Sequence, residues 1–227
     1  MILRINKSSG IPVQINVLLS IYWQKYIYFL CNATIFIFFA SYNQESETGM
    51  DEKEMINACM RGESWARKRV YEIYAPTMMS LCIRYVGDPE TARDLLQDGF
   101  IKVFTKIRTY SERGAFGGWV HRIFVTTALE YLRKTDALRS AVDLADYSEQ
   151  LKDADVSVLD KLSADDLMGC VKNLPPGYRT VFNMYAIEGY SHAEIAKALG
   201  ISVATSKTQF LRARNALQKS VKRLISN

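Results

Sequence analysis

The sequence has little cysteine and histidine, and these residues are widely spaced. Its four cysteines, Cys31, Cys59, Cys82 and Cys170, form no CxxC pair, and there are only two histidines. A zinc site needs closely spaced cysteine and histidine ligands, and a disulfide framework is typical of small secreted domains rich in cysteine. We therefore expect no metal site, and we expect the thiols to be reduced, as in the cytosol.

A catalytic constellation is also missing from the sequence. His121 and His192 share no motif with a cysteine, a serine or a pair of carboxylates. An active site needs a nucleophile, a base and an orienting group together, so we expect neither an enzyme nor a bound cofactor. Five prolines and twelve glycines among 227 residues also exclude collagen-like and low-complexity classes.

The sequence does have enough apolar residues for folded domains, and its net charge is small. Hydrophobic residues make up 48% of the chain, and 29 Lys and Arg against 24 Asp and Glu leave a net charge of +5. This length and composition fit one large domain or two small ones. A net charge of this size does not by itself indicate a polyanion partner, so the distribution of charge along the chain matters more.

Residues 1–49 differ in amino-acid composition from the rest of the chain. Residues 26–42, YIYFLCNATIFIFFASY, are uncharged, and their length is at the short limit of a membrane-spanning helix, which needs roughly 17 to 25 residues. Asn32 and Thr34 interrupt the run and no A-x-A cleavage pattern follows, whereas Met50 opens a polar, amphipathic segment. Three interpretations stay open: translated upstream sequence with Met50 rather than Met1 as the true start, a membrane anchor or signal, and a genuine extension.

Residues 50–138 are predicted to form a helical domain, because their apolar residues recur at helical spacing in three stripes. Asp88 and Pro89 supply a helix start after the first stripe, since a carboxylate caps free amides and proline fits the first helical position. Residues 111–114 separate the second stripe from the third, which ends in Arg133 and Lys134. We expect most stripe residues to form the core of a bundle.

A linker is predicted at residues 139–162. Residues 141–160 carry six acidic side chains and one basic one, a net charge of −5, and no helical stripe dominates there. Weakly patterned, charged segments of this kind stay solvated. We therefore expect an all-α protein with two small helical domains, residues 50–138 and 163–227, joined by this acidic linker.

The second domain contains a helix-turn-helix signature in residues 190–217. Ser191 and Glu194 have the spacing of a capping box, Gly200 allows the left-handed turn conformation, and Ser202 can cap the next helix. A helix, a short glycine turn and a second helix make the helix-turn-helix motif. The sequence therefore predicts this motif as the functional centre of the domain.

The second helix of the motif carries polar groups suited to base edges and cations suited to phosphates. Seven cations follow Glu194 and no further acidic residue does. We expect this helix pair to lie at a distance from the first domain, with Lys207 and Gln209 open to solvent. The candidate DNA contacts are Ser202, Thr205, Ser206, Lys207, Gln209, Arg212 and Arg214.

The two helical domains, the acidic linker and the terminal motif together resemble an extracytoplasmic-function (ECF) sigma factor, the promoter-recognition subunit of bacterial RNA polymerase. The resemblance covers about residues 54–225. Residues 94–100, DLLQDGF, match the family pattern D-L-x-Q-[ED]-x-F in the helical pair that docks on the polymerase clamp helices. This match implies polymerase contacts from Asp94, Leu95, Gln97, Asp98 and Phe100, although Leu95 and Phe100 also fit a core.

Residues 116–134, FGGWVHRIFVTTALEYLRK, resemble the helix that binds and opens the −10 promoter element. Aromatic side chains capture unstacked bases for roughly 1 to 3 kcal/mol per base, although the two aromatic candidates here also fit a core. One candidate, Thr126, stands where many relatives have Asn, and a threonine makes no bidentate contact to adenine. The implied contacts are Phe116, Trp119, Arg122, Thr126, Arg133 and Lys134.

The resemblance also implies that the second domain reads the −35 promoter element, where relatives often have Arg in place of Gln209. It implies three partners, namely RNA polymerase core, promoter DNA and an anti-sigma factor, which in this family can be a membrane protein. The implied location is the cytoplasm, and residues 1–49 leave a membrane-associated form open. The alternative is a stand-alone helix-turn-helix regulator that dimerises on operator DNA, which explains residues 190–217 but neither residues 94–100 nor the acidic linker.

Overall fold

The computed structural model describes residues 52–135 and 164–226, with side chains for 52–135 and 166–224. Every regular element in these two ranges is a helix, which confirms the all-α prediction. Residues 1–49, the alternative start Met50 and the predicted acidic linker 139–162 lie outside the described residues.

The first block of helices follows the three predicted stripes, with an additional short helix before them. The helix start at Asp88 and Pro89 is confirmed: Asp88 Oδ2 accepts a hydrogen bond from the Thr91 amide at 2.8 Å, and Pro89 is the first helical residue. The preceding helix ends at Gly87, whose φ of 80° is in the left-handed region. The elements of this block are α2 (Glu52–Arg61), α3 (Ser64–Val86), α4 (Pro89–Lys106), the short η1 (Ile107–Thr109) and α5 (Phe116–Lys134).

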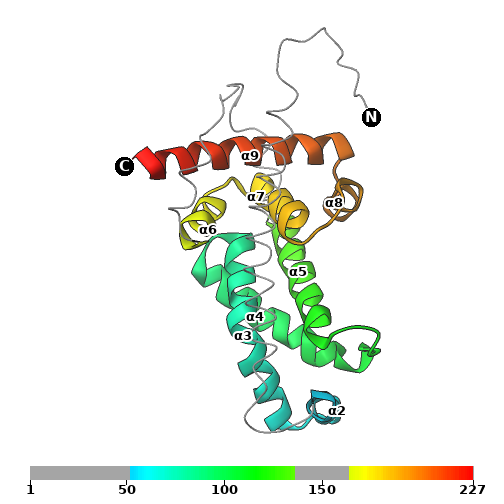
Figure 1. The fold of residues 1–227 in the computed structure, drawn as a ribbon. Coiled ribbons are helices and arrows are strands. Elements are labelled where there is room, and N and C mark those ends of the chain that lie inside the picture. The colour runs from blue at the N-terminus through cyan, green and yellow to red at the C-terminus, as the bar shows by residue number, and fades with distance from the viewer. Residues whose placement is uncertain (1–51, 136–163, 227) are drawn as a thin grey trace, which may run out of the picture.

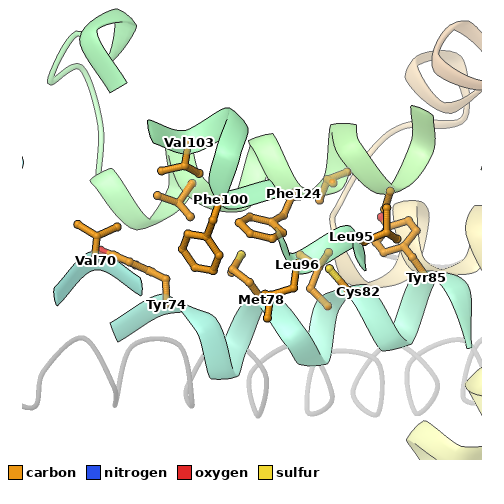
Figure 2. Packing of buried hydrophobic residues seen from close by; sticks show 14 of the residues in the cluster. Val70, Tyr74, Met78, Cys82, Tyr85, Leu95, Leu96, Phe100, Val103 and Phe124 are labelled. Carbon is orange, nitrogen blue, oxygen red and sulfur yellow. The ribbon is translucent and has the colours of Figure 1, made fainter. Parts of the chain in front are cut away.

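The core of the first block lies between α3, α4 and α5. Figure 2 shows one face of α3, from Val70 to Tyr85, directed at residues of α4 and at Phe124 of α5. The α3 positions recur every three or four residues, as the hydrophobic stripe predicted. Because the facing sides of α3, α4 and α5 are buried in this core, the opposite side of each helix remains open to a partner.

The second block contains the predicted helix-turn-helix. Its own core gathers around Tyr178 and Phe182, with Ala213 and Leu217 of the last helix packed against them. The segment Asn183–Ile187, η3, is a π-helix continuous with the preceding helix. The other elements are α6 (Ala164–Lys172), α7 (Pro176–Phe182), α8 (His192–Leu199) and α9 (Val203–Ser226).

The two blocks pack against each other, so the prediction that the C-terminal helix pair lies at a distance is wrong for this structure. Helix α3 contacts both α6 and α7, and Val181, Met184 and Ile195 belong to the buried cluster of the first block. In Figure 1, α9 lies across one end of the first block, with α6, α7 and α8 between them. Part of this contact is a buried ion pair between Arg84 and Glu188, and a hydrophobic pattern in the sequence does not reveal polar contacts of this kind.

No helix in the described ranges is both long enough and apolar enough to span a membrane. Residues 26–42, for which a membrane span is one of the open interpretations, lie outside those ranges.

Candidate protein and nucleic-acid interfaces

Helix α4 presents a polar stripe to solvent. Asp94, Gln97 and Asp98 are exposed and lie on one face, because residues three and four positions apart are neighbours on a helix. Leu95 and Phe100 point the other way and are buried, with 2% and 4% of their surfaces exposed. The prediction that these two contact a partner directly is therefore wrong for this structure: they anchor α4 in the core and so orient the stripe.

An exposed isoleucine extends the same stripe, and the sequence analysis missed it. Ile101 is 62% exposed, and it lies seven residues after Asp94 and four after Gln97, which places it on the same helical face. On the adjacent helix α3, Tyr71 is also exposed, and its ring centroid is 4.7 Å from that of Phe100. The spacing 94, 97, 98, 101 was available in the sequence and could have identified Ile101. The resulting face combines acidic, amide and apolar groups, which suits a protein partner.

Helix α5 presents a second stripe, of mixed aromatic and basic character. Arg122, Thr126, Arg133 and Lys134 are exposed, and Trp119 is half-buried at the start of the stripe. The Trp119 ring lies over the ring of Phe116, with centroids 5.6 Å apart and planes inclined by 23°. The cations are exposed, and part of the Trp119 side chain is exposed beside them.

Phe116 itself is fully buried, so the prediction that it contacts DNA is wrong for this structure. Its ring packs edge-on against Tyr74 and Tyr110, with centroid distances of 5.7 and 5.2 Å. A ring enclosed in this way supports Trp119 from behind rather than stacking on a base.

The helix-turn-helix has the local chemistry that its sequence predicted. The Ser191 hydroxyl accepts a hydrogen bond from the Glu194 amide, and the Glu194 carboxylate accepts one from the Ser191 amide at 2.8 Å. These hydrogen bonds lower the pKa of Glu194, so the capping box is ionised and intact at neutral pH. Gly200 adopts a φ of 67°, and the Ser202 hydroxyl accepts a hydrogen bond from the Thr205 amide at 2.9 Å. The turn therefore fixes where α9 begins.

The exposed face of α9 near its start differs from the one that the sequence predicted. Lys207 is exposed as expected, and so are Thr208 and Leu211, the latter with 54% of its surface open. The sequence analysis missed both, although the spacing 204, 207, 208, 211 marks one helical face. This face offers a cation, a hydroxyl and an apolar group side by side.

Gln209 and Ser206 are buried, so the predicted contacts from these two residues to bases are wrong for this structure. Gln209 is 7% exposed and Ser206 is fully buried. The Ser206 hydroxyl lies 2.9 Å from Nδ1 of His192 in α8, and the His192 ring stacks on Tyr185 with centroids 4.2 Å apart. Burial, with a smaller contribution from Lys207, lowers the pKa of His192. Ser206 therefore connects the two helices of the motif.

The remaining predicted residues of this surface are only partly open. Thr205, Arg212 and Arg214 are half-buried, while Ser202 is exposed but engaged in capping α9. Arg212 donates a long hydrogen bond, 3.4 Å, from Nη1 to the Tyr178 hydroxyl. Arg212 lies four residues after Thr208, so it borders the exposed face of α9.

The cysteines of the described ranges belong to the cores. Cys59, Cys82 and Cys170 are free and buried. Burial raises the pKa of each thiol, that of Cys82 to about 12. They stay protonated at neutral pH and are poor nucleophiles. Within the same ranges no group of three or more His, Cys, Asp or Glu side chains is placed to hold a metal ion.

Two family models match the chain, one in each block. The model for sigma-70 region 2 matches residues 70–137, and the model for sigma-70 region 4 matches residues 164–217. The matched segments together make up more than half of the chain. They include the exposed stripes of α4 and α5 and the helix-turn-helix.

Individual proteins with similar sequences are also sigma factors. The ECF RNA polymerase sigma factor SigE of Mycolicibacterium smegmatis is 31% identical over 149 residues, which are 64% of this chain and 57% of that protein. The ECF RNA polymerase sigma factor SigW of Bacillus subtilis is 28% identical over 182 residues, which are 76% of this chain and 97% of that one. A solved structure of the sigma factor RpoE in complex with the anti-sigma factor NepR, from Bartonella quintana, aligns with a TM-score of 0.42 and 21% identity over 68% of this chain and 96% of that one.

Proposed function

The chain belongs to the ECF group of the sigma-70 family, and we propose that it brings RNA polymerase core to specific promoters and helps to open them. The observation that carries this proposal is that one chain matches both sigma regions and that each matched region has an exposed face of the required chemistry. A sigma factor supplies binding and specificity, while the polymerase performs the chemistry. We place the protein in the cytoplasm, where its polymerase partner acts.

The α4 stripe is the proposed polymerase-docking face. Asp94, Gln97 and Asp98 offer hydrogen-bond acceptors and an amide, and Ile101 supplies the apolar contact that a protein interface buries at its centre. Because Leu95 and Phe100 hold α4 in the core, the face is already formed before the partner arrives, which limits the entropic cost of binding.

Reversing the charge of Asp98 should weaken polymerase binding. We expect Asp98→Lys to raise the dissociation constant for core polymerase by about 30-fold, since losing a central interface contact costs about 2 kcal/mol. The matched control is Glu90→Lys, an exposed reversal in the first turn of the same helix, which should change the constant by less than about threefold. The measurement is titration of labelled protein with core enzyme; equal effects of the two variants would remove Asp98 from the docking face.

The α5 stripe is the proposed −10 surface. Arg122, Arg133 and Lys134 are exposed along one side of the helix and suit backbone phosphates. Trp119, supported by Phe116, is half-buried, and its exposed part can meet an unstacked base. Thr126 is exposed between them, but its hydroxyl donates to the Arg122 carbonyl at 2.8 Å, so it offers a base only an acceptor.

The face of Lys207, Thr208 and Leu211 is the proposed −35 reading surface, with Arg212 at its border. A hydroxyl can hydrogen-bond to base edges, an apolar side chain can contact a thymine methyl group, and a lysine can contact a phosphate. Gln209 takes no part in this surface, because it is buried. We therefore expect Gln209→Ala to weaken binding of all sequences through the fold, instead of at one base position.

Removing the Lys207 ammonium should weaken DNA binding without changing sequence preference. We expect Lys207→Ala to lower the slope of log K against log salt concentration by about one, because one phosphate contact and its released counterion are lost. Fluorescence anisotropy over a salt series measures the slope. Lys68→Ala, an exposed lysine of α3 in the other block, is the control and should leave the slope unchanged; a slope unchanged in Lys207→Ala as well would rule out this contact.

The whole proposal is tested by reconstitution. Purified protein should co-elute with core polymerase and give transcripts from specific promoters that core enzyme alone does not give. A stand-alone regulator would instead bind its DNA with the same affinity whether or not core enzyme is present. We also propose an anti-sigma factor as a third partner; co-purification from native cells, with loss of transcription on adding it back, tests this part.

A further inference from the structure

A hydrogen bond between two side chains joins the helices of the helix-turn-helix. Nδ1 of His192, at the first position of α8, lies 2.9 Å from the hydroxyl oxygen of Ser206 in α9. Ser206 is fully buried, and its hydroxyl makes no other hydrogen bond within the described residues. In Figure 1 the start of α9 lies beside α8. The bond therefore ties the first turn of one helix to the first turn of the other.

This bond lies at the opposite end of α8 from the turn. At the turn, the Ile201 amide donates a hydrogen bond to the Ala196 carbonyl at 3.1 Å, which fixes where the chain leaves α8. The helix runs from His192 to Leu199, so at about 1.5 Å per residue its two ends are about 10 Å apart. Because α9 is attached at both ends of α8, it cannot swing about the turn, and the angle between the helices is set.

Aromatic rings hold the histidine in place. The His192 ring lies flat on Tyr185 of η3, with centroids 4.2 Å apart and planes inclined by 12°. Phe210 of α9 meets the His192 ring edge-on at 5.9 Å and also contacts Tyr185 at 4.5 Å. Because a ring held by two neighbours has little rotational freedom, Nδ1 is directed at Ser206 before DNA binds.

Ser206 is adjacent to the proposed reading face of α9. Lys207 follows it directly, and Thr208 and Leu211 complete the exposed face. A helix is rigid over so few residues, so any rotation of α9 at Ser206 turns these three side chains by the same angle. The hydrogen bond therefore sets the orientation at which the face meets a DNA groove.

The bond requires a neutral imidazole. The Ser206 hydroxyl has one hydrogen and Nδ1 as its partner, so Nδ1 accepts and the imidazole hydrogen is on Nε2. A proton added to Nδ1 would leave the buried hydroxyl hydrogen without an acceptor. Burial lowers the pKa of His192, and the facing Lys207 of α9 lowers it further. Of the other titratable groups beside the ring, Tyr185 of η3 is the stacked ring, and Glu194 of α8 is engaged in the capping box.

We propose that His192 and Ser206 are positioning residues for recognition of the −35 element, and that their hydrogen bond orients the α9 face toward base edges. The inference rests on the proposed function, because a reading face exists only if this domain reads DNA. Neither side chain needs to contact a base. The two act through Lys207, Thr208 and Leu211, which they hold at one angle.

Two replacements of His192 separate the hydrogen bond from the ring packing. Phenylalanine keeps a ring on Tyr185 but accepts no hydrogen bond, whereas the oxygen of asparagine takes about the place of Nδ1 and the ring is lost. We expect His192→Phe to lower the preference for the −35 element over a scrambled one by about fivefold. His192→Asn should lower it by less than about twofold at neutral pH. A role in packing alone would give the opposite order.

The preference is measured by fluorescence anisotropy with holoenzyme, the complex of the full chain with core polymerase. One duplex is recovered from random-sequence DNA by binding to the original holoenzyme, and the other differs only in a scrambled −35 element. Phosphate contacts carry no sequence information, so the slope of log K against log salt concentration should stay unchanged in His192→Phe, unlike in Lys207→Ala. The control is Ser80→Ala, which removes an exposed hydroxyl of α3 and should change neither quantity.

A double-mutant cycle tests the pair itself. Ser206→Ala removes the other partner of the bond and should also lower the preference by about fivefold. Adding Ser206→Ala to His192→Phe should then lower it by less than about a further twofold, because the bond is already lost. Additive losses would show that the two side chains act separately, which would overturn the proposal.

The pH profile gives a readout that packing alone does not move. Because the pKa of His192 is lowered in the fold, the bond is intact above the ordinary imidazole value of about 6.5 and is lost as the pH falls below it. Asparagine does not titrate, so the preference of the original holoenzyme relative to His192→Asn should fall toward that of His192→Phe in acid. A rise in acid would instead make protonated His192 a phosphate contact and would overturn the positioning role.

The outcomes separate the inference from the proposed function. If the original holoenzyme selects no −35 sequence, the proposed function is wrong, and the positioning role falls with it. If it selects one, but His192→Phe keeps the full preference or loses less than His192→Asn, only the positioning role is wrong. Should His192→Phe not fold by circular dichroism, Ser206→Ala and the pH profile of the original protein make the same test.

Discussion

Gly99→Ala should lower the free energy of unfolding by about 3 kcal/mol, although it adds a single methyl group. A Cβ at this position of α4 would come within 3.0 Å of three ring atoms of Phe124 in α5. Phe124 is fully buried and packs edge-on against Phe100, with centroids 5.2 Å apart, so the ring has no free space to move into. Overpacking of a dense core typically costs 1 to 3 kcal/mol, and about 3 is expected here because a backbone-fixed atom meets an enclosed ring. Urea unfolding followed by circular dichroism measures the loss.

Gly118→Ala is the matched control for Gly99→Ala. Gly118 is also helical and a Cβ there meets nothing within 4 Å, so alanine should stabilise the protein by about 0.5 to 1 kcal/mol through helix propensity. Adding Phe124→Leu to Gly99→Ala should recover part of the loss, because the smaller side chain vacates the space that the methyl group enters. Equal stabilities of the two glycine variants would contradict the close α4–α5 approach.

Arg179→Met should destabilise the protein by about 4 kcal/mol and should uncouple the two blocks. The guanidinium donates hydrogen bonds to the Tyr85 and Val86 carbonyls of one block and to the Lys172 and Leu174 carbonyls of its own. Methionine fills a similar space but donates none of these hydrogen bonds, and an unsatisfied buried carbonyl costs about 1 to 3 kcal/mol. Because the lost contacts join the blocks, unfolding should change from one transition to two.

The uncoupling is measurable by comparing two probes in urea. In a Trp23→Phe background the two remaining tryptophans, Trp65 and Trp119, lie in the first block. The fluorescence then follows that block, whereas far-ultraviolet circular dichroism follows all helices. In Arg179→Met the two curves should separate. Arg69→Met, which alters an exposed ion pair of 3.8 Å, should leave the curves together and change stability by less than about 0.5 kcal/mol. Coincident curves in Arg179→Met would show that the blocks are coupled by other contacts.

The helices and their caps were predictable because short-range chemistry determines them. Asp88, Ser191 and Gly200 act within one turn of their own positions, and the sequence alone shows this spacing. The family resemblance correctly identified the two sigma regions. Where it assigned partner contacts to Leu95, Phe100 and Phe116, the amphipathic pattern already allowed a core, and the core is where these residues lie.

The packing of the two blocks was not predictable in the same way. It depends on polar residues about a hundred positions apart, such as Arg84 and Glu188 or Asn183 and the Arg84 carbonyl. No periodicity links such pairs, and a single sequence contains no record of which residues vary together. The burial of Gln209 was missed for a related reason: a glutamine on a basic helix suits a base edge, and only the neighbouring helices decide which face of α9 is covered.

The π-helix of residues 183–187 determines how the elements after it are oriented relative to α7. Its wider turn accommodates one residue more than an α-helix would over the same rise. Winding the same residues into an ordinary α-helix would therefore rotate everything that follows by about 100° relative to α7. Glu188 would then face away from Arg84 with no side chain altered, so the width of this one turn, and not only the side chains, aligns the buried ion pair between the two blocks.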